Sequence, residues 1–239
     1  MDSRTSMNQQ QLRSQMASIW AEAFGDNAEF IDYYFNVYDS PDTRIVRCDD
    51  EGDGSVIAEM HFYPFLNRTG HGAYIYGVAT SAKWRRHGLA ESMICESFSR
   101  MRNWGATYAV LIAENEDLKR WYASMGFVEM DGVISVRGDS DGFDFGMEKV
   151  SENVGLYRIV NPFGFLSIYA AYYPEADFTI RISDPLLPVN NGTYHVSSRK
   201  ISISNSPSGD DIEVLTPSDL LKRFPVIFDG KIIIDSDNS

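Results

Sequence analysis

Apolar positions change their spacing along the first 130 residues, and the changes predict alternating helices and strands. Stretches with apolar residues every three or four positions predict helices over residues 12–24, 28–38, 89–101 and 115–125. Alternating or continuous apolar runs predict strands over residues 43–48, 55–66, 73–80, 107–112 and from 127 onward. Because strands and helices alternate, we expect an α/β (α+β) fold whose mixed sheet has parallel neighbours around the first crossover.

A smaller α+β unit is expected after a turn-rich acidic stretch near residue 140. We place the boundary so that residues 1–145 form one domain and residues 146–239 the other. The pattern of the second unit predicts a helix over 161–172, a strand over 178–183 and one or two strands over 193–204. Thr216-Pro217 marks the start of a last helix, with a capping threonine followed by proline at the first helical position.

Charge and cysteine content narrow the functional classes. Acidic residues outnumber basic ones by 34 to 21, for a net charge of −13, which disfavours nucleic acid as a partner and favours cations such as amines. The two cysteines, Cys48 and Cys95, have no spacing typical of zinc or disulfide sites, so we expect reduced thiols in a cytoplasmic protein and no metal. No signal peptide is expected, and the apolar stretch 163–173 is too short for a membrane span.

One basic loop reverses the acidic character of the chain where a strand is expected to lead into a helix. Its residues are Arg85, Arg86, His87, Gly88, Leu89 and Ala90. Unpaired N–H groups at a helix start bind a diphosphate, and a glycine lets the backbone approach that anion. The stretch is neither a P-loop nor a dinucleotide fingerprint. An ordinary solvated basic patch is the alternative.

This loop resembles the acyl-CoA pyrophosphate loop of the GNAT N-acetyltransferases, in its R/Q-x-x-G-x-G/A form. A second block of that family matches in register at Asn115, Tyr122, Gly126 and Phe127. The resemblance covers about residues 10–140 and implies the mixed-sheet acyl-CoA N-acyltransferase fold, with acetyl-CoA as co-substrate.

Further residues are similar to the acetyltransferases named for enhanced intracellular survival of mycobacteria. They are Trp20, Phe24, Gly25, Asp26, Phe30, Ile31 and the run Gly77–Thr80. That group carries a C-terminal sterol-carrier-protein-like domain, and the pattern from Arg181 to Tyr194 resembles its strand–turn–strand signature. The family's middle domain has no room in this sequence, so its oligomeric assembly is not carried over and a homo-oligomer stays open.

The resemblance implies a role for each matching residue. The backbone of Val78, Ala79 and Thr80 would bind pantetheine and polarise the thioester, and Arg85–Ala90 would hold the diphosphate. Tyr122 would protonate the departing thiolate, although its position on an apolar helix face also fits simple packing. Asn115 would bind pantetheine or only cap its helix.

The general base is less clearly marked. Alternation along the strand 55–66 puts Glu59 and His61 together on its more polar face, where either could accept the ammonium proton. A structural polar pair is the alternative. Relatives of the resembled group use their C-terminal carboxylate, here that of Ser239, and Tyr74 and Tyr76 are candidates to line an acceptor pocket.

Together these residues predict an acetyl-CoA-dependent N-acetyltransferase that acts on a primary amine, either of a cationic small molecule or of a lysine side chain. The main alternative is a non-catalytic acyl-CoA-binding sensor or scaffold, which would keep the basic loop but would not need Tyr122. A lipid carrier built on the second unit is a third class. The sequence does not name the amine.

Overall fold

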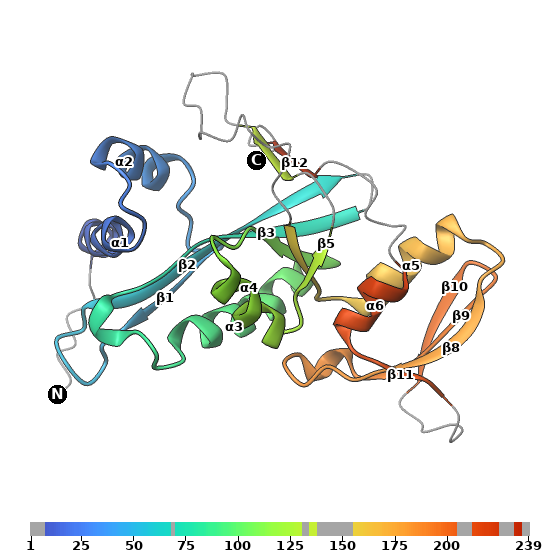
Figure 1. Cartoon of the computed structure of the whole chain (residues 1–239). Coiled ribbons are helices and arrows are strands. Elements are labelled where there is room, and N and C mark those ends of the chain that lie inside the picture. Colours follow the sequence, from blue (N-terminus) through green and yellow to red (C-terminus); the bar gives the residue numbers. More distant parts are fainter. Residues whose placement is uncertain are drawn as a thin grey trace. The chain divides into compact units, whose positions relative to one another are not determined.

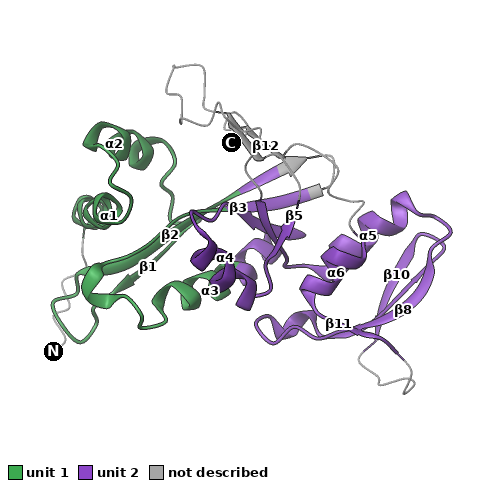
Figure 2. Ribbon diagram, in the orientation of Figure 1, with its two compact units in different colours: residues 1–63, 75–97 green, residues 64–74, 98–239 purple. Residues whose placement is uncertain are grey.

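The structure, a computed structural model, describes residues 8–67, 70–130, 134–137, 155–204, 212–224 and 232–235. The chain divides into two compact units (Figure 2). Unit 1 comprises residues 1–63 and 75–97, and unit 2 comprises residues 64–74 and 98–239.

Helices and strands alternate along the chain (Figure 1). The helices are α1 (Gln9–Phe24), α2 (Ala28–Val37), the 3₁₀ turn η1 (Ala82–Trp84), α3 (Leu89–Asn103), α4 (Glu116–Ser124), α5 (Pro162–Tyr172), the 3₁₀ turn η3 (Pro188–Asn190) and α6 (Pro217–Arg223). The strands are β1 (Arg44–Cys48), β2 (Val56–Asn67), β3 (Gly70–Thr80), β4 (Tyr108–Leu111), β5 (Val128–Met130), β6 (Ile134–Arg137), β7 (Gly155–Ile159), β8 (Asp177–Ile182), β9 (Gly192–Ser197), β10 (Lys200–Ser204), β11 (Val214–Leu215) and β12 (Ile232–Asp235).

The described strands form a mixed sheet in the order β1-β2-β3-β4-β7-β5, a second sheet in the order β10-β9-β8-β11, and a parallel pair of β12 with β6. The pairing of β3 with β4 is parallel, as the first crossover predicted, and that of β1 with β2 is antiparallel. Every helix and strand predicted for the first 130 residues is present, with ends that differ by a few positions. The mixed α/β architecture is therefore confirmed.

Strand β7 was not predicted, and it completes the mixed sheet. It pairs antiparallel with both β4 and β5, and all five of its residues are buried. β7 follows the predicted boundary at residues 145 and 146, which itself lies outside the described residues. The first sheet thus includes a strand that follows the predicted boundary, and the division of the chain at that boundary stays a prediction.

A buried ion pair ties β7 to the loop after β8 within unit 2. Arg158 Nη2 lies 2.7 Å from Asp184 Oδ1, and both residues are almost fully buried. The Arg158 guanidinium also lies 4.2 Å from the ring centre of Phe98. Asp184 Oδ1 accepts the N–H groups of Leu186 and Leu187, so the charges inside this core are well satisfied.

Unit 1 has a core made from both helices of its N-terminal pair and from two strands. The buried residues of this core, the aromatic core of unit 1, are Met16, Ile19, Trp20, Ile31, Tyr34, Phe35, Val56 and Ala79. Trp20 contacts the rings of Tyr34 and Phe35, with centroids 4.4 and 5.7 Å away. The helical apolar periods of the sequence therefore face β2 and β3, as amphipathic helices do.

Candidate functional site

The basic loop leads from β3 through η1 into α3, and residues 75–97, which contain it, belong to unit 1. Arg86 and Gly88 both have left-handed backbone, with φ of 66° and 75°. No described atom beyond its own neighbours lies within 4 Å of the place where a Gly88 Cβ would project. Residues 85–88 are exposed, and α3 begins directly after them. The loop thus presents backbone N–H groups and basic side chains at a helix start, which suits a bound anion.

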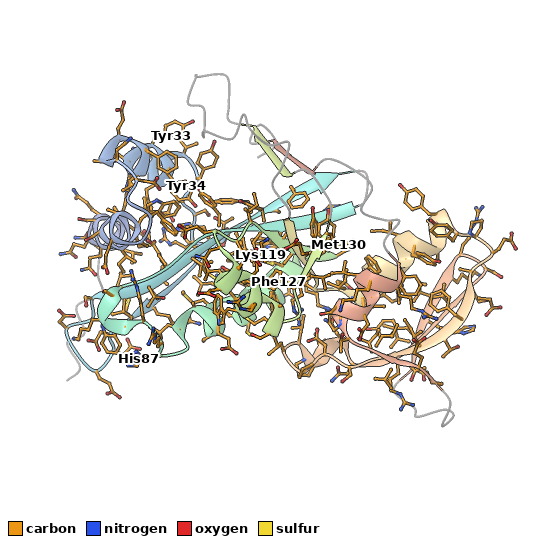
Figure 3. The ribbon with its side chains drawn as sticks, in the orientation of Figure 1. Tyr33, Tyr34, His87, Lys119, Phe127 and Met130 are labelled. Carbon is orange, nitrogen blue, oxygen red and sulfur yellow. The ribbon has the colours of Figure 1, made fainter. Side chains whose placement is uncertain are left out.

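The loop's basic side chains differ in their contacts. Arg85 Nε donates to the carbonyl of Thr80 at 3.1 Å, and Arg85 Nη2 lies 3.7 Å from Glu22 Oε1. His87 Nδ1 lies 2.9 Å from the carbonyl oxygen of Arg85, which assigns the Nδ1 proton as a donor to it. Figure 3 labels His87 in the loop that precedes α3. The side chains of Arg86 and His87 are exposed in this loop, while the Arg85 side chain also contacts Thr80 and Glu22.

Strand β3 continues beyond its ladder with β4. The ladder joins Gly72, Ala73 and Tyr74 to β4 and ends there, while β3 runs on to Thr80. Gly77 has a φ of 59°, and a Cβ on it would lie 2.4 Å from the Trp20 ring, so both backbone and space require glycine. Ala79 is buried, whereas Val78 and Thr80 are partly exposed.

Glu59 and His61 lie side by side on β2, and both are fully buried. His61 Nε2 is 3.4 Å from Glu59 Oε2. Ala58, Met60 and Phe62 on the opposite face are buried as well, so both faces of this part of β2 are covered and the pair does not face solvent. On the side that carries His61, the rings of Trp20, Tyr34 and Phe35 surround it, with centroids 5.2 to 5.7 Å away.

A buried ion pair lies next to these two residues. Arg44 stands directly opposite His61 in the β1–β2 ladder and pairs with Asp39. Burial, reinforced by the Asp39 charge, raises the pKa of Glu59 to about 9. Burial and the nearby Arg44 lower the pKa of His61 to about 3. Both groups are thus uncharged near neutral pH, so their contact joins two neutral side chains.

Two polar atoms of this pair remain unsatisfied. Glu59 Oε1 and His61 Nδ1 have no hydrogen-bond partner among the described residues. Buried polar atoms are nearly always paired, so both are placed to bond a group that enters the core, whether water or ligand. No sequence signal marked Arg44 or Asp39 as their neighbours, because strand pairing was not predictable for the first strand.

The second matching block lies on α4, in unit 2. Asn115 Oδ1 accepts the N–H of Leu118 at 3.0 Å, so the capping role is confirmed. Tyr122 is 7% exposed and packs edge-on against Phe127. Burial raises the pKa of Tyr122 to about 12, so its phenol keeps its proton through the neutral range. Its predicted role in proton donation stays a prediction.

The remaining candidates have different surroundings. Tyr74 is buried, and Tyr76 packs against Trp20 and Tyr34 within unit 1. The carboxylate of Ser239 lies outside the described residues. Within the described ranges, no group of three or more histidine, cysteine or acidic side chains is arranged to hold a metal. None of the described helices combines the length and apolar character needed to cross a membrane.

Comparisons with known proteins bear on the family and the fold. Residues 7–129 match the family profile described as Acetyltransferase (GNAT) domain, just over half of the 239 residues. No curated protein sequence matches the chain significantly.

Solved structures share the fold at low sequence identity. Eis1 from Mycobacterium abscessus has a TM-score of 0.60 at 10% identity, covering 91% of this chain and 88% of its own. A GCN5-related N-acetyltransferase from Anabaena variabilis has a TM-score of 0.61 at 12% identity, covering 90% and 88%. A protein from Enterococcus faecalis described as a probable N-acyltransferase has a TM-score of 0.65 at 12% identity, covering 89% and 87%.

Proposed function

This chain belongs to the GNAT acetyltransferase family, and from that premise we propose that it transfers an acetyl group from acetyl-CoA directly to a primary amine. The acceptor is a cationic small molecule or a lysine side chain. The observation that carries the proposal is the basic loop 85–90, with left-handed Arg86 and Gly88 at the start of α3 in a chain of net charge −13.

The loop supports a binding role for the diphosphate of acetyl-CoA. The first N–H groups of α3 supply donors, Arg86 supplies positive charge, and the exposed His87 side chain lies beside it. The part of β3 that runs past its ladder with β4 carries the backbone of Val78 and Thr80. These backbone groups would bond pantetheine and polarise the thioester carbonyl.

The proposed reaction is a direct displacement. The neutral amine attacks the thioester carbonyl, a C–N bond forms, the C–S bond breaks, and the thiolate leaves. Tyr122 donates a proton to that thiolate, a step that suits a phenol protonated at neutral pH. Glu59, in its carboxylate form, accepts the proton that the ammonium must lose before attack, and His61, whose pKa is about 3, stays neutral beside it. Since the pKa of Glu59 is about 9, its carboxylate form becomes more available as pH rises from 7 toward 9.

Three further properties stay predictions. We keep the sterol-carrier-protein-like assignment for the C-terminal part, a cytoplasmic location and a role of the C-terminal part in holding the amine.

Release of free thiol from acetyl-CoA, measured with a panel of amines, tests the proposed function. The panel holds a lysine peptide, a diamine, a polyamine and an aminoglycoside. Thiol release that depends on one of these amines supports the transferase. Tight acetyl-CoA binding with no release for any amine would instead favour the non-catalytic acyl-CoA-binding module.

A further inference from the structure

A carboxylate from α1 lies at the start of the basic loop. The 3₁₀ turn η1 receives no side-chain hydrogen bond from its own N-cap residue, Ser81. Instead, the N–H of Ala82 donates to Glu22 Oε1 at 2.7 Å, across 60 positions of the chain. The first N–H groups of a helix lack partners inside it, so Glu22 supplies a cap that the local sequence does not.

The same oxygen of Glu22 also faces Arg85. Arg85 Nη2 lies 3.7 Å from it, while Arg85 Nε donates to the carbonyl of Thr80. The Arg85 and Glu22 side chains are 53% and 40% exposed, so their attraction contributes little to stability. Its effect is geometric, because it holds the Arg85 side chain against the residues that precede it. Glu22 thus contacts both ends of η1.

A second contact from α1 reaches the same segment. Trp20, two positions before Glu22, lies against Gly77, where a Cβ would come within 2.4 Å of the indole ring. The Trp20 Nε1–H donates to Asp26 Oδ2 at 2.8 Å, which fixes the indole. The last turns of α1 therefore touch the segment 77–85 at the left-handed glycine of β3 and again at η1.

We propose that Glu22 is a positioning residue for acyl-CoA: by capping η1 and restraining Arg85, it holds the basic loop in the shape that receives the diphosphate. This inference rests on the proposed function. Glu22 acts through the loop and does not itself touch the ligand. No feature of the sequence marked it, since it lies on the exposed face of a helix far from the loop in the chain.

Whether CoA binding becomes weaker or stronger when Glu22 is replaced distinguishes a positioning role of Glu22 from a purely electrostatic one. A carboxylate near a bound diphosphate repels it, so removal of the charge alone would strengthen binding. Loss of the hydrogen bond to Ala82 would instead loosen the loop and weaken binding. Glu22→Gln removes the charge but keeps a side-chain oxygen that can accept from Ala82, whereas Glu22→Ala removes both.

The experiment measures the affinity of CoA for the full chain by isothermal titration calorimetry. We expect Glu22→Ala to weaken binding about three- to tenfold, the range that a single hydrogen bond commonly supports. Glu22→Gln should bind CoA at least as tightly as the parent protein. In turnover assays, Glu22→Ala should raise the KM for acetyl-CoA and leave the KM for the amine unchanged. Glu51→Ala, which removes one exposed acidic side chain from unit 1, is the matched control.

Thermal unfolding of each variant separates loss of the loop's shape from loss of the fold. Unchanged or tighter CoA binding by Glu22→Ala would overturn the inference, as would equal weakening in Glu22→Ala and Glu22→Gln. A parent protein that does not bind CoA would overturn the proposed function itself, which is a distinguishable result.

Discussion

His61 Nε2 lies 3.4 Å from Glu59 Oε2 in the interior of unit 1, and neither side chain is charged near neutral pH. Burial keeps the carboxyl protonated and the imidazole neutral, so each group is held in the form opposite to the one it favours in water at pH 5–6. Burying two such groups lowers the stability of the folded protein. Proteins commonly retain destabilising residues at positions where activity requires them, and Glu59 and His61 occupy a candidate catalytic position.

Glu59→Gln should make the protein more stable and less active. The pKa of Glu59 is raised from 4.5 to about 9, so between these values the folded chain holds a proton that the unfolded chain has lost. Stability therefore falls as pH rises through that window, and a neutral glutamine removes this loss. We expect the free energy of unfolding at pH 7.5 to rise by roughly 2–4 kcal/mol, as measured by urea denaturation.

The increase in the free energy of unfolding caused by Glu59→Gln should become smaller as the pH falls toward 5. His61 acts in the opposite sense, because its lowered pKa makes stability fall as pH drops below 6.5, and this dependence should persist in the variant. Equal or lower stability of Glu59→Gln at pH 7.5 would contradict the assignment of a protonated Glu59. Full activity of that variant would show that Glu59 takes no part in the reaction.

Tyr122→Phe should lower turnover and leave acetyl-CoA binding nearly intact. A lost general acid commonly reduces the rate by ~10²–10⁴-fold, and phenylalanine keeps the packing against Phe127. The measurement is kcat across pH 6–9, with CoA affinity by calorimetry as the control. Turnover at the parental rate across that range would show that Tyr122 only packs.

Gly88→Trp should lower acetyl-CoA affinity by about tenfold or more, because the side chain would stand where the backbone meets the diphosphate. The site has open space for a Cβ, but its φ of 75° disfavours any other residue. Gly88→Ala is the smaller step and should weaken binding less. Circular dichroism checks the fold, and unaltered affinity in a folded Gly88→Trp protein would place the diphosphate elsewhere.

Asp184→Ala should destabilise unit 2 by about 3–5 kcal/mol, because it leaves the buried Arg158 guanidinium without its counter-charge. Asp184→Asn keeps an acceptor for the neighbouring N–H groups and should cost less. The exposed pair of Arg120 with Asp117 is the matched control, and Asp117→Ala should leave the denaturation midpoint nearly unchanged. A midpoint unaffected by Asp184→Ala would mean that solvent reaches the guanidinium.

Local sequence patterns predicted most of the helices and strands, but they did not predict all of the contacts that join these elements. The caps at Asn115 and Thr216 are formed as predicted, since capping depends on a few adjacent residues. β7 was missed because Gly-Leu-Tyr-Arg-Ile is short and has a charged residue at its fourth position. The counter-charge that stabilises the buried arginine comes from Asp184, which is distant in the chain.

The candidate site shows the same limit. The basic loop could be predicted, because its residues are contiguous and their helix-start geometry is local. The surroundings of Glu59 could not, because alternation says which side chains share a face and not what covers that face. Helices α1 and α2 bring Trp20 and Tyr34 over it, and Arg44 arrives through strand pairing.

The place of β7 between β4 and β5 sets an order for folding during synthesis. Residues 155–159 must be synthesised before β4 and β5 can both pair with β7. Until then the buried strand Tyr108–Leu111 keeps an apolar, unpaired edge of the kind that joins other chains. A nascent or shortened chain that stops before residue 155 is therefore the form most exposed to aggregation and to chaperones.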